Sequence, residues 1–146
     1  MHVVLDTNVL VRAAPGRTGP ARELLELVAK PPHVVVSSPP LLDELARALA
    51  YPRLRLIHGL DDAGISQYVA DVEAVAMVVP LITPTVTAIE SDPDDNAVIA
   101  AAIAGQAEVI CTRDRHFRDP RVVHFCASYG IRILDDVELL RELRGS

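Results

Sequence analysis

The chain has 146 residues and is half hydrophobic, which suits one domain over residues 1–146 with a buried core and leaves little room for a second. No apolar run approaches the roughly 20 residues of a membrane helix, and no secretory signal precedes the first strand-like segment, so we expect a cytoplasmic protein without a membrane partner. The net charge of -6 argues against a broad basic surface for nucleic acid, and two cysteines are too few for a disulfide framework.

Strand-like and helix-like segments alternate through the first half of the chain. Ser38 is a typical N-cap with Pro39 in the first helical position, while Pro31-Pro32 and Tyr51-Pro52 are expected to end helices. The pattern predicts, in chain order, a strand at His2–Leu5, a helix from Thr18-Gly19-Pro20 to about Ala29, a strand at His33–Val36, a helix from Pro39 to about Ala50, and a helix at Asp61–Val75.

The second half continues the alternation. Pro80 and Pro84 indicate that its first strand is short or lies at a sheet edge. The predicted elements are a strand at Val78–Ile82, a helix opened by Asp92-Pro93-Asp94-Asp95 and ending at Ala104, strands at Glu108–Cys111 and Ile131–Leu134, and a helix at Asp135–Leu143. Such an order favours βαβ units and therefore an α/β fold on a parallel sheet.

Polar residues follow two of the predicted strands. Asp6 and Asn8 come directly after the first strand, and Asp114 follows Thr112 and Arg113 after the strand that ends at Cys111. The carboxyl ends of parallel strands share one edge of a sheet, where α/β enzymes carry their chemistry. A carboxylate at a core edge is costly unless a cation binds there, so this pattern suggests a metal site.

Helical phase selects two further acids. At about 100° per residue, Glu44 borders the apolar stripe of its helix, while Asp43 lies opposite and is placed to pair with Arg47. In the later helix Asp95 falls in line with the apolar stripe, whereas Asp94 lies off that line.

Each acid also has an ordinary structural explanation. Asp6 could initiate a turn, Glu44 could be a charge at a helix edge, Asp95 could complete a capping box with Asp92, and Asp114 could open the following turn. Their joint placement at strand ends and near helix N-termini is what favours a site.

The basic residues are unevenly distributed. No lysine or arginine lies between Leu56 and Thr112, and a basic cluster follows at once, made of Arg113, Arg115, His116, Arg118, Arg121 and His124. Such a cluster beside an acidic pocket could hold a phosphate chain. The alternative is a solvated surface in which these arginines pair with Asp114 and Asp119.

Taken together, four motifs resemble the PIN-domain nucleases over almost the whole chain. The similarity is strongest to the bacterial and archaeal branch of toxins from toxin-antitoxin pairs, the relatives of the VapC toxins. The motifs are Val3-Val4-Leu5-Asp6-Thr7-Asn8-Val9-Leu10; Ser37 with Leu42, Glu44, Leu45, Leu49, Pro52 and Leu54; Asp92-Pro93-Asp94-Asp95 before an alanine-rich helix; and Val109-Ile110-Cys111-Thr112-Arg113-Asp114.

The resemblance implies a three-layer α/β/α sandwich on a parallel sheet of about five strands. It also implies that four acids meet at the carboxyl edge as catalytic residues and metal ligands: Asp6, Glu44, Asp95 and Asp114. Asn8 matches the polar residue that accompanies the first acid, and Thr112 matches the hydroxyl residue before the fourth. Arg113 departs from the family pattern, where glycine is common, and it could alter the loop or reach a phosphate.

The expected chemistry follows from oxygen ligands without cysteine or histidine, which favour Mg²⁺ or Mn²⁺. We therefore expect metal-dependent hydrolysis of RNA phosphodiester bonds, with Arg113 and Arg115 as substrate-binding residues. The resemblance also implies a cognate antitoxin as partner. The segments Asp61–Val75 and Val75–Val79 are candidate surfaces for an antitoxin or a homodimer, although burial against the sheet is the simpler role.

Two other classes of protein share parts of this pattern. A phosphatase of the haloacid-dehalogenase type also has an Asp after its first strand, but it needs a second Asp where this chain has Asn8. A non-catalytic PIN-like module for binding or assembly would not need four costly carboxylates. Metal-enhanced stability and nuclease activity discriminate between these classes.

Overall fold

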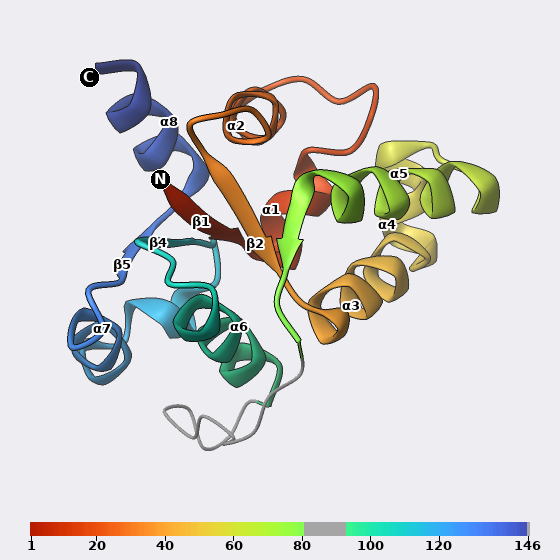
Figure 1. Ribbon diagram of the computed structural model, residues 1–146. Coiled ribbons are helices and arrows are strands. Elements are labelled where there is room, and N and C mark those ends of the chain that lie inside the picture. The colour runs from red at the N-terminus through yellow and green to blue at the C-terminus, as the bar shows by residue number, and fades with distance from the viewer. Residues whose placement is uncertain (81–92, 146) are drawn as a thin grey trace.

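Five parallel strands form one central sheet. The computed structural model describes residues 1–80 and 93–145, with the side chains of 93–95 outside the description. The strands are β1 (His2–Leu5), β2 (Val34–Ser37), β3 (Ala76–Val78), β4 (Val109–Cys111) and β5 (Arg132–Leu134), in the spatial order β3-β2-β1-β4-β5. All their carboxyl ends therefore lie at the same edge (Figure 1).

Helices cover both faces of this sheet, which gives the expected α/β/α sandwich. One face carries α1 (Thr7–Arg12), α2 (Pro20–Val28), α3 (Pro39–Leu49), α5 (Asp62–Val75) and α8 (Asp136–Gly145). The other carries α6 (Pro93–Ala104), the 3-10 helix η1 (Arg115–Arg118) and α7 (Pro120–Ala127). The short helix α4 (Pro52–His58) extends from the end of α3 (Figure 1).

Strand alternation divides the core into two clusters. Val3 and Leu5 of β1 face the layer that contains α1 and α2, whereas Val4 faces the layer that contains α6. Val4 is paired with Val36 on one side and Ile110 on the other, and all three are almost fully buried. The central strands are thus apolar on both faces, as expected for a parallel sheet between two helical layers.

The structure confirms most of the predicted elements. The bounds of β1, β2, β4 and β5 lie within one residue of the strands predicted at His2–Leu5, His33–Val36, Glu108–Cys111 and Ile131–Leu134. Ser38 and Asp61 precede α3 and α5 as expected, and Asp61 accepts a hydrogen bond from the Gly64 amide at 2.7 Å.

The strand predicted at Val78–Ile82 was misplaced. Pairing begins two residues earlier, at Ala76, which lies beside Val35 directly after α5. The Val79 amide still bonds the Ser37 carbonyl at 2.9 Å, and Pro80 has no amide hydrogen with which to continue. The rest of the predicted strand, from position 81, lies outside the described residues.

Four short helical segments were not predicted: α1, α4, η1 and α7. α1 follows β1 without a loop because Asp6 serves as its N-cap and Val9 and Leu10 are buried. The buried Tyr68 of α5 donates its hydroxyl to the Leu10 carbonyl at 2.6 Å, which fixes α1 against the helical layer. None of the described helices is long and apolar enough to cross a membrane.

Candidate active site

Asp6 occupies the junction between β1 and α1, where the chain leaves the sheet. Its side chain is buried, with 6% of the residue surface exposed. One carboxylate oxygen accepts the Thr7 amide at 2.8 Å, and the other accepts the Thr112 hydroxyl at 2.7 Å and the Asn8 side-chain amide at 3.3 Å. The carboxylate is therefore oriented by groups from two neighbouring strand ends.

Thr112 links Asp6 to Asp114. Its hydroxyl donates to Asp6 and accepts the Asp114 backbone amide at 3.0 Å, so one buried side chain sets both the orientation of the first acid and the turn that carries the other. Such a hydroxyl uses its donor and an acceptor position at once. The supporting role of Thr112 in function stays a prediction. Its hydroxyl makes the contacts with Asp6 and Asp114 that such a role requires.

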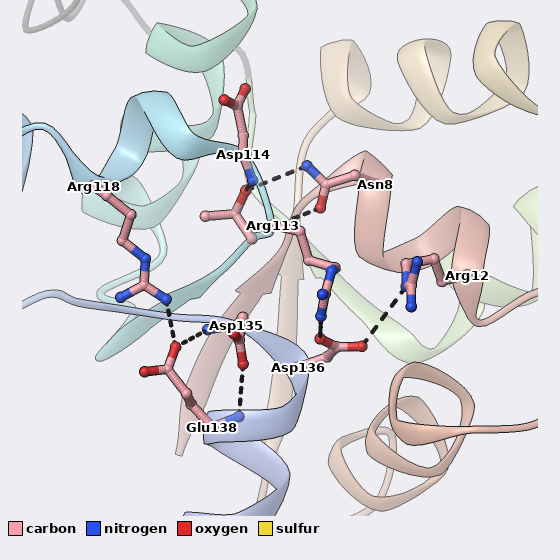
Figure 2. A network of polar contacts seen from close by, with 9 residues as sticks. Asn8, Arg12, Arg113, Asp114, Arg118, Asp135, Asp136 and Glu138 are labelled. Carbon is pink, nitrogen blue, oxygen red and sulfur yellow. Dashed lines mark hydrogen bonds and ion pairs between the residues drawn. The ribbon is translucent and has the colours of Figure 1, made fainter.

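Asn8 makes the complementary contact from α1. Its side-chain oxygen accepts the Arg113 backbone amide at 3.0 Å, while its nitrogen reaches Asp6 and, at 3.4 Å, the Thr112 hydroxyl. The turn after β4 is thus fastened to α1, as Figure 2 shows for Asn8 and the Arg113–Asp114 segment.

Asp114 is half-buried at the start of η1. One of its oxygens accepts the His116 amide at 2.9 Å and lies 3.4 Å from the His116 ring nitrogen Nδ1. The alternative structural reading of this acid, that it opens the following turn, is therefore correct. A carboxylate retains further lone pairs after accepting one amide, so capping and ligand binding are compatible.

A cleft of about 430 Å³ lies over these groups. Its walls contain three of the predicted acids, Asp6, Glu44 and Asp114. Glu44 is half-buried and enters from α3, as its helical phase predicted, whereas Asp43 is exposed. The remaining lining residues are Thr7, Asn8, Val11, Arg12, Ala48, Leu54 and Arg113.

The fourth predicted acid, Asp95, lies in the first turn of α6, but its side chain is outside the described residues. The choice of Asp95 over Asp94, and the alternative that Asp95 forms a capping box with Asp92, also concern side chains outside the described residues. Helix α6 itself packs against β1, β2 and β4.

Burial raises the pKa of Asp6 above its ordinary value. Desolvation is the largest cause, and the negative charge of Asp114 acts in the same direction. The hydrogen bonds from Thr112, Thr7 and Asn8 lower the pKa and offset part of this effect. The fold thus holds a carboxylate where its charge is unfavourable without a counter-ion.

This donor set fits a hard divalent cation. Oxygen ligands from carboxylates suit Mg²⁺ or Mn²⁺, and a cation would offset the cost of burying the Asp6 charge. Among the side chains that the structure describes, no group of three acidic, histidine or cysteine residues lies close enough together to hold a metal ion.

The predicted basic cluster is only partly a solvated surface. Arg121 pairs with Asp119 at 3.2 Å, as the solvated alternative predicted, but Arg118 pairs with Glu138. Arg113 turns to Asp136 instead of Asp114 and lines the cleft, and Arg115 is exposed beside it.

Two residues of the site were missed by sequence reasoning. Arg12 lines the cleft from the last turn of α1, a helix that was not predicted. Asp136 is fully buried and joins Arg113 and Arg12 in ion pairs. A signal for Asp136 existed, because it follows an apolar strand as Asp6 and Asp114 do.

Comparisons with known proteins agree with this architecture. No curated protein sequence matches the chain. The solved structure of VapBC2 from Rickettsia felis bound to a promoter DNA fragment is similar, with a TM-score of 0.62 and 18% identity over 92% of this chain and 98% of that chain. FitAcB from Neisseria gonorrhoeae is also similar, with a TM-score of 0.57 and 14% identity over the same shares of the two chains.

At these identities the two structures establish a shared fold. The sequence itself matches the family model described as PIN domain over residues 2–116. This match includes β1, Glu44, the start of α6 and the Thr112–Asp114 turn. The chain therefore belongs to the PIN domain family.

Proposed function

We propose that the protein is a cytoplasmic, metal-dependent endoribonuclease. The observation that carries this proposal is the buried, hydrogen-bonded Asp6 carboxylate, joined through Thr112 to Asp114 in a cleft that Glu44 also lines. Membership of a family of nucleases supports hydrolysis of a phosphodiester bond, and it favours this function over a phosphatase of the haloacid-dehalogenase type.

The acids would hold one or two Mg²⁺ or Mn²⁺ ions. Asp6 and Asp95 are the proposed principal ligands, Asp114 is a further ligand, and Glu44 orients water or holds a second ion. Such an ion supplies Lewis-acid chemistry that polarises the scissile phosphate and offsets developing negative charge. Thr112 and Asn8 keep the Asp6 carboxylate in one orientation through the contacts described above.

The proposed substrate is RNA in single-stranded or loop regions. An unpaired backbone can enter an open cleft, and proteins commonly recognise RNA in such regions. Arg113 at the cleft and the exposed Arg115 beside it are proposed to contact phosphate oxygens, since guanidinium groups match phosphate geometry.

We also propose that the nuclease is the toxin of a toxin-antitoxin pair. The two similar structures, VapBC2 and FitAcB, support this role by their shared fold. A protein antitoxin would block the acidic cleft, and a small DNA-binding protein encoded immediately upstream would support the pairing. The α5 helix and β3, with exposed Val75, Met77 and Val78, are the proposed surface for the antitoxin or a homodimer.

The test is cleavage of structured and single-stranded RNAs by the purified protein with Mg²⁺, Mn²⁺ or a chelator. Asp6→Asn should lose activity by about a hundredfold or more, since even residues that only support a metal ligand contribute about 10- to 100-fold. Glu44→Gln should lose activity, whereas Asp43→Asn, the exposed neighbour on the same helix, is the charge-matched control and should not.

Metal-dependent cutting that Asp6→Asn lacks supports the nuclease. Undiminished metal-dependent cutting by Asp6→Asn contradicts the assignment of the site. Metal-induced stabilisation without cutting of any RNA would instead favour a PIN-like binding module.

A further inference from the structure

Two arginines of the cleft converge on one buried carboxylate. Arg113 donates from Nη1 to the Oδ1 atom of Asp136, and Arg12 places Nε 4.0 Å from the Oδ2 atom. The Asp136 side chain is 1% exposed, whereas those of Arg113 and Arg12 are 39% and 50% exposed. Figure 2 shows the two guanidinium groups approaching Asp136 from different elements.

The backbone of each of the three residues is part of a helix or is hydrogen-bonded to one. Asp136 lies in the first turn of α8, where Asp135 and Glu138 exchange backbone-to-side-chain hydrogen bonds of 2.7 and 2.9 Å. The Arg113 backbone is fastened to Asn8 at 3.0 Å, and Arg12 belongs to the last turn of α1. Arg113 is therefore held at its backbone and at its guanidinium, whereas Arg12 is held at its backbone and lies within ion-pair distance of Asp136.

The contacts with Asp136 leave hydrogen-bond donors of both arginines unused. A guanidinium has five N–H donors, and Arg113 uses one of them on Oδ1. Oδ2 has no hydrogen-bond donor among the described residues, so its relation to Arg12 is an ion pair without a hydrogen bond. Both arginines thus retain donors on their exposed sides.

The two arginines supply the positive charge among the described residues that line the cleft. Of its described lining residues, Arg12 and Arg113 are the cations, and Asp6, Glu44 and Asp114 are the anions. A polynucleotide entering this cleft meets repulsion from the acids, and the two cations counter part of that repulsion, with Arg113 already ordered by its hydrogen bond to Asp136. A pocket of about 120 Å³ beside Arg113 is lined by Arg115 and Arg118 and also by the carboxylates Asp114 and Asp135.

We propose that Arg12 and Arg113 form a clamp for a phosphate next to the scissile one, and that Asp136 is the positioning residue that holds the clamp open toward the cleft. This inference rests on the proposed nuclease function and adds two residues to it. Arg12 and Arg113 lie within residues 2–116, which match the family model, and Asp136 lies beyond them in α8.

The clamp is tested first by RNA binding without catalysis. A fluorescent single-stranded RNA is titrated by anisotropy in chelator at several salt concentrations, with wild type, Arg113→Ala, Arg12→Ala, Asp136→Asn and Arg144→Ala. Arg144 pairs with Glu23 at 3.5 Å on the surface and gives a charge-matched control. We expect about tenfold weaker binding for Arg113→Ala, a salt slope reduced by about 0.7 for each lost phosphate contact, and no change for Arg144→Ala.

The double variant Arg113→Ala with Asp136→Asn separates positioning from folding. Arg113→Ala alone leaves a buried carboxylate with one distant partner and should unfold more easily, and neutralising Asp136 should restore stability. Affinity should not be restored, because the phosphate contact is gone. Asp136→Asn should weaken binding in the wild-type background and weaken it less in the Arg113→Ala background, where only Arg12 remains to be positioned.

Cleavage kinetics supply the second measurement. Clamp variants should raise KM by about tenfold with a smaller change in kcat, which distinguishes them from Asp6→Asn. Unchanged affinity and salt slope in Arg113→Ala, or additive effects of Arg113→Ala and Asp136→Asn, would overturn the clamp. If the wild type cuts no RNA, the nuclease proposal fails separately, while the anisotropy titrations still decide whether the arginines bind the phosphate chain.

Discussion

The buried carboxyl group of Asp6 makes the stability of the protein depend on pH. The residue accepts three hydrogen bonds, yet desolvation still raises its pKa above the ordinary value of 3.8. The native state therefore keeps this proton to a higher pH than the unfolded state does. By linkage, the free energy of unfolding falls as the pH rises from the ordinary pKa of about 3.8 through the raised pKa of the native state.

Asp6→Asn should remove this pH dependence. In chelator, the variant should gain stability relative to wild type as the pH rises above 3.8, by about 1.4 kcal/mol for each unit by which the pKa is raised, and the difference should then level off. Urea unfolding at a series of pH values measures it, with Asp43→Asn as the exposed control. A stability difference that does not change with pH would contradict a raised Asp6 pKa.

Thr112 should matter through its hydroxyl rather than its shape. Thr112→Val keeps the volume but removes the donor to Asp6 and leaves the Asp114 amide without this acceptor. We expect a loss of about 1–3 kcal/mol in the free energy of unfolding and weaker metal binding. Thr112→Ser retains the hydroxyl and should keep metal affinity close to that of wild type. Unfolding and metal titrations of the two variants make the comparison, and equal metal affinity would contradict the role given to the hydroxyl.

At the scale of elements, apolar runs and helix starts predicted most of the sheet and the longer helices. β1, β2 and β4 are recognisable because a central parallel strand is apolar on both faces. The prediction of β3 failed at its bounds because Ala76 pairs immediately after α5, with no turn residue to mark the change.

The helices that were not predicted begin in segments whose residues also fit a strand or the end of a preceding helix. Val9, Leu10 and Val11 in α1 are typical of a strand, and only the Asp6 cap and tertiary packing make them helical. Tyr51-Pro52 was read as a helix end, but Pro52 begins α4, and Pro120 after Asp119 begins α7 in the same way. A proline that ends one helix can open the next.

The site was predictable where a strand end or a helical phase dictated direction, as for Asp6 and Glu44. Arg12 was not, because its position depends on α1 being a helix. The Arg113–Asp136 pair joins positions 23 residues apart across β5, and no local pattern encodes such a contact. Tertiary ion pairs of this kind appear only once the strand order is known.

Gly105 is an element-level test of how closely α6 approaches the sheet. A Cβ atom there would lie 2.4 Å from the Cγ1 atom of Val36 on β2. Gly105→Ala should therefore destabilise the protein by about 1–3 kcal/mol through overpacking. Chemical denaturation of Gly105→Ala measures the loss, and Gly145→Ala, where an added Cβ would meet nothing within 4 Å, is the control.

The cause can be separated from a backbone effect by shortening the neighbour. In a Val36→Ala background the same glycine substitution should cost clearly less, because the colliding methyl groups are absent. An equal cost in both backgrounds would show that the collision with Val36 is not the reason.

At the scale of the whole molecule, an excess of negative charge accompanies a cleft that is lined by the carboxylates Asp6, Glu44 and Asp114. The net charge is -6, and no lysine or arginine lies between Leu56 and Thr112. Asp6 has a raised pKa partly because Asp114 faces the same site. A divalent cation bound in the cleft relieves both burial and repulsion, so its binding should stabilise the native state as a whole.

Mg²⁺ should therefore raise the melting temperature of wild type. At a free concentration about 100 times Kd, a single site contributes about 2.7 kcal/mol, which corresponds to roughly 5–10 °C for a chain of this size. Thermal unfolding in chelator and in Mg²⁺ is compared at equal ionic strength, so that screening of the net charge does not contribute. Asp43→Asn should respond as wild type does, whereas Asp6→Asn should respond little. An equal increase in Asp6→Asn would place the stabilising ion elsewhere on the acidic surface, since only a site that uses the Asp6 carboxylate loses its affinity with that charge.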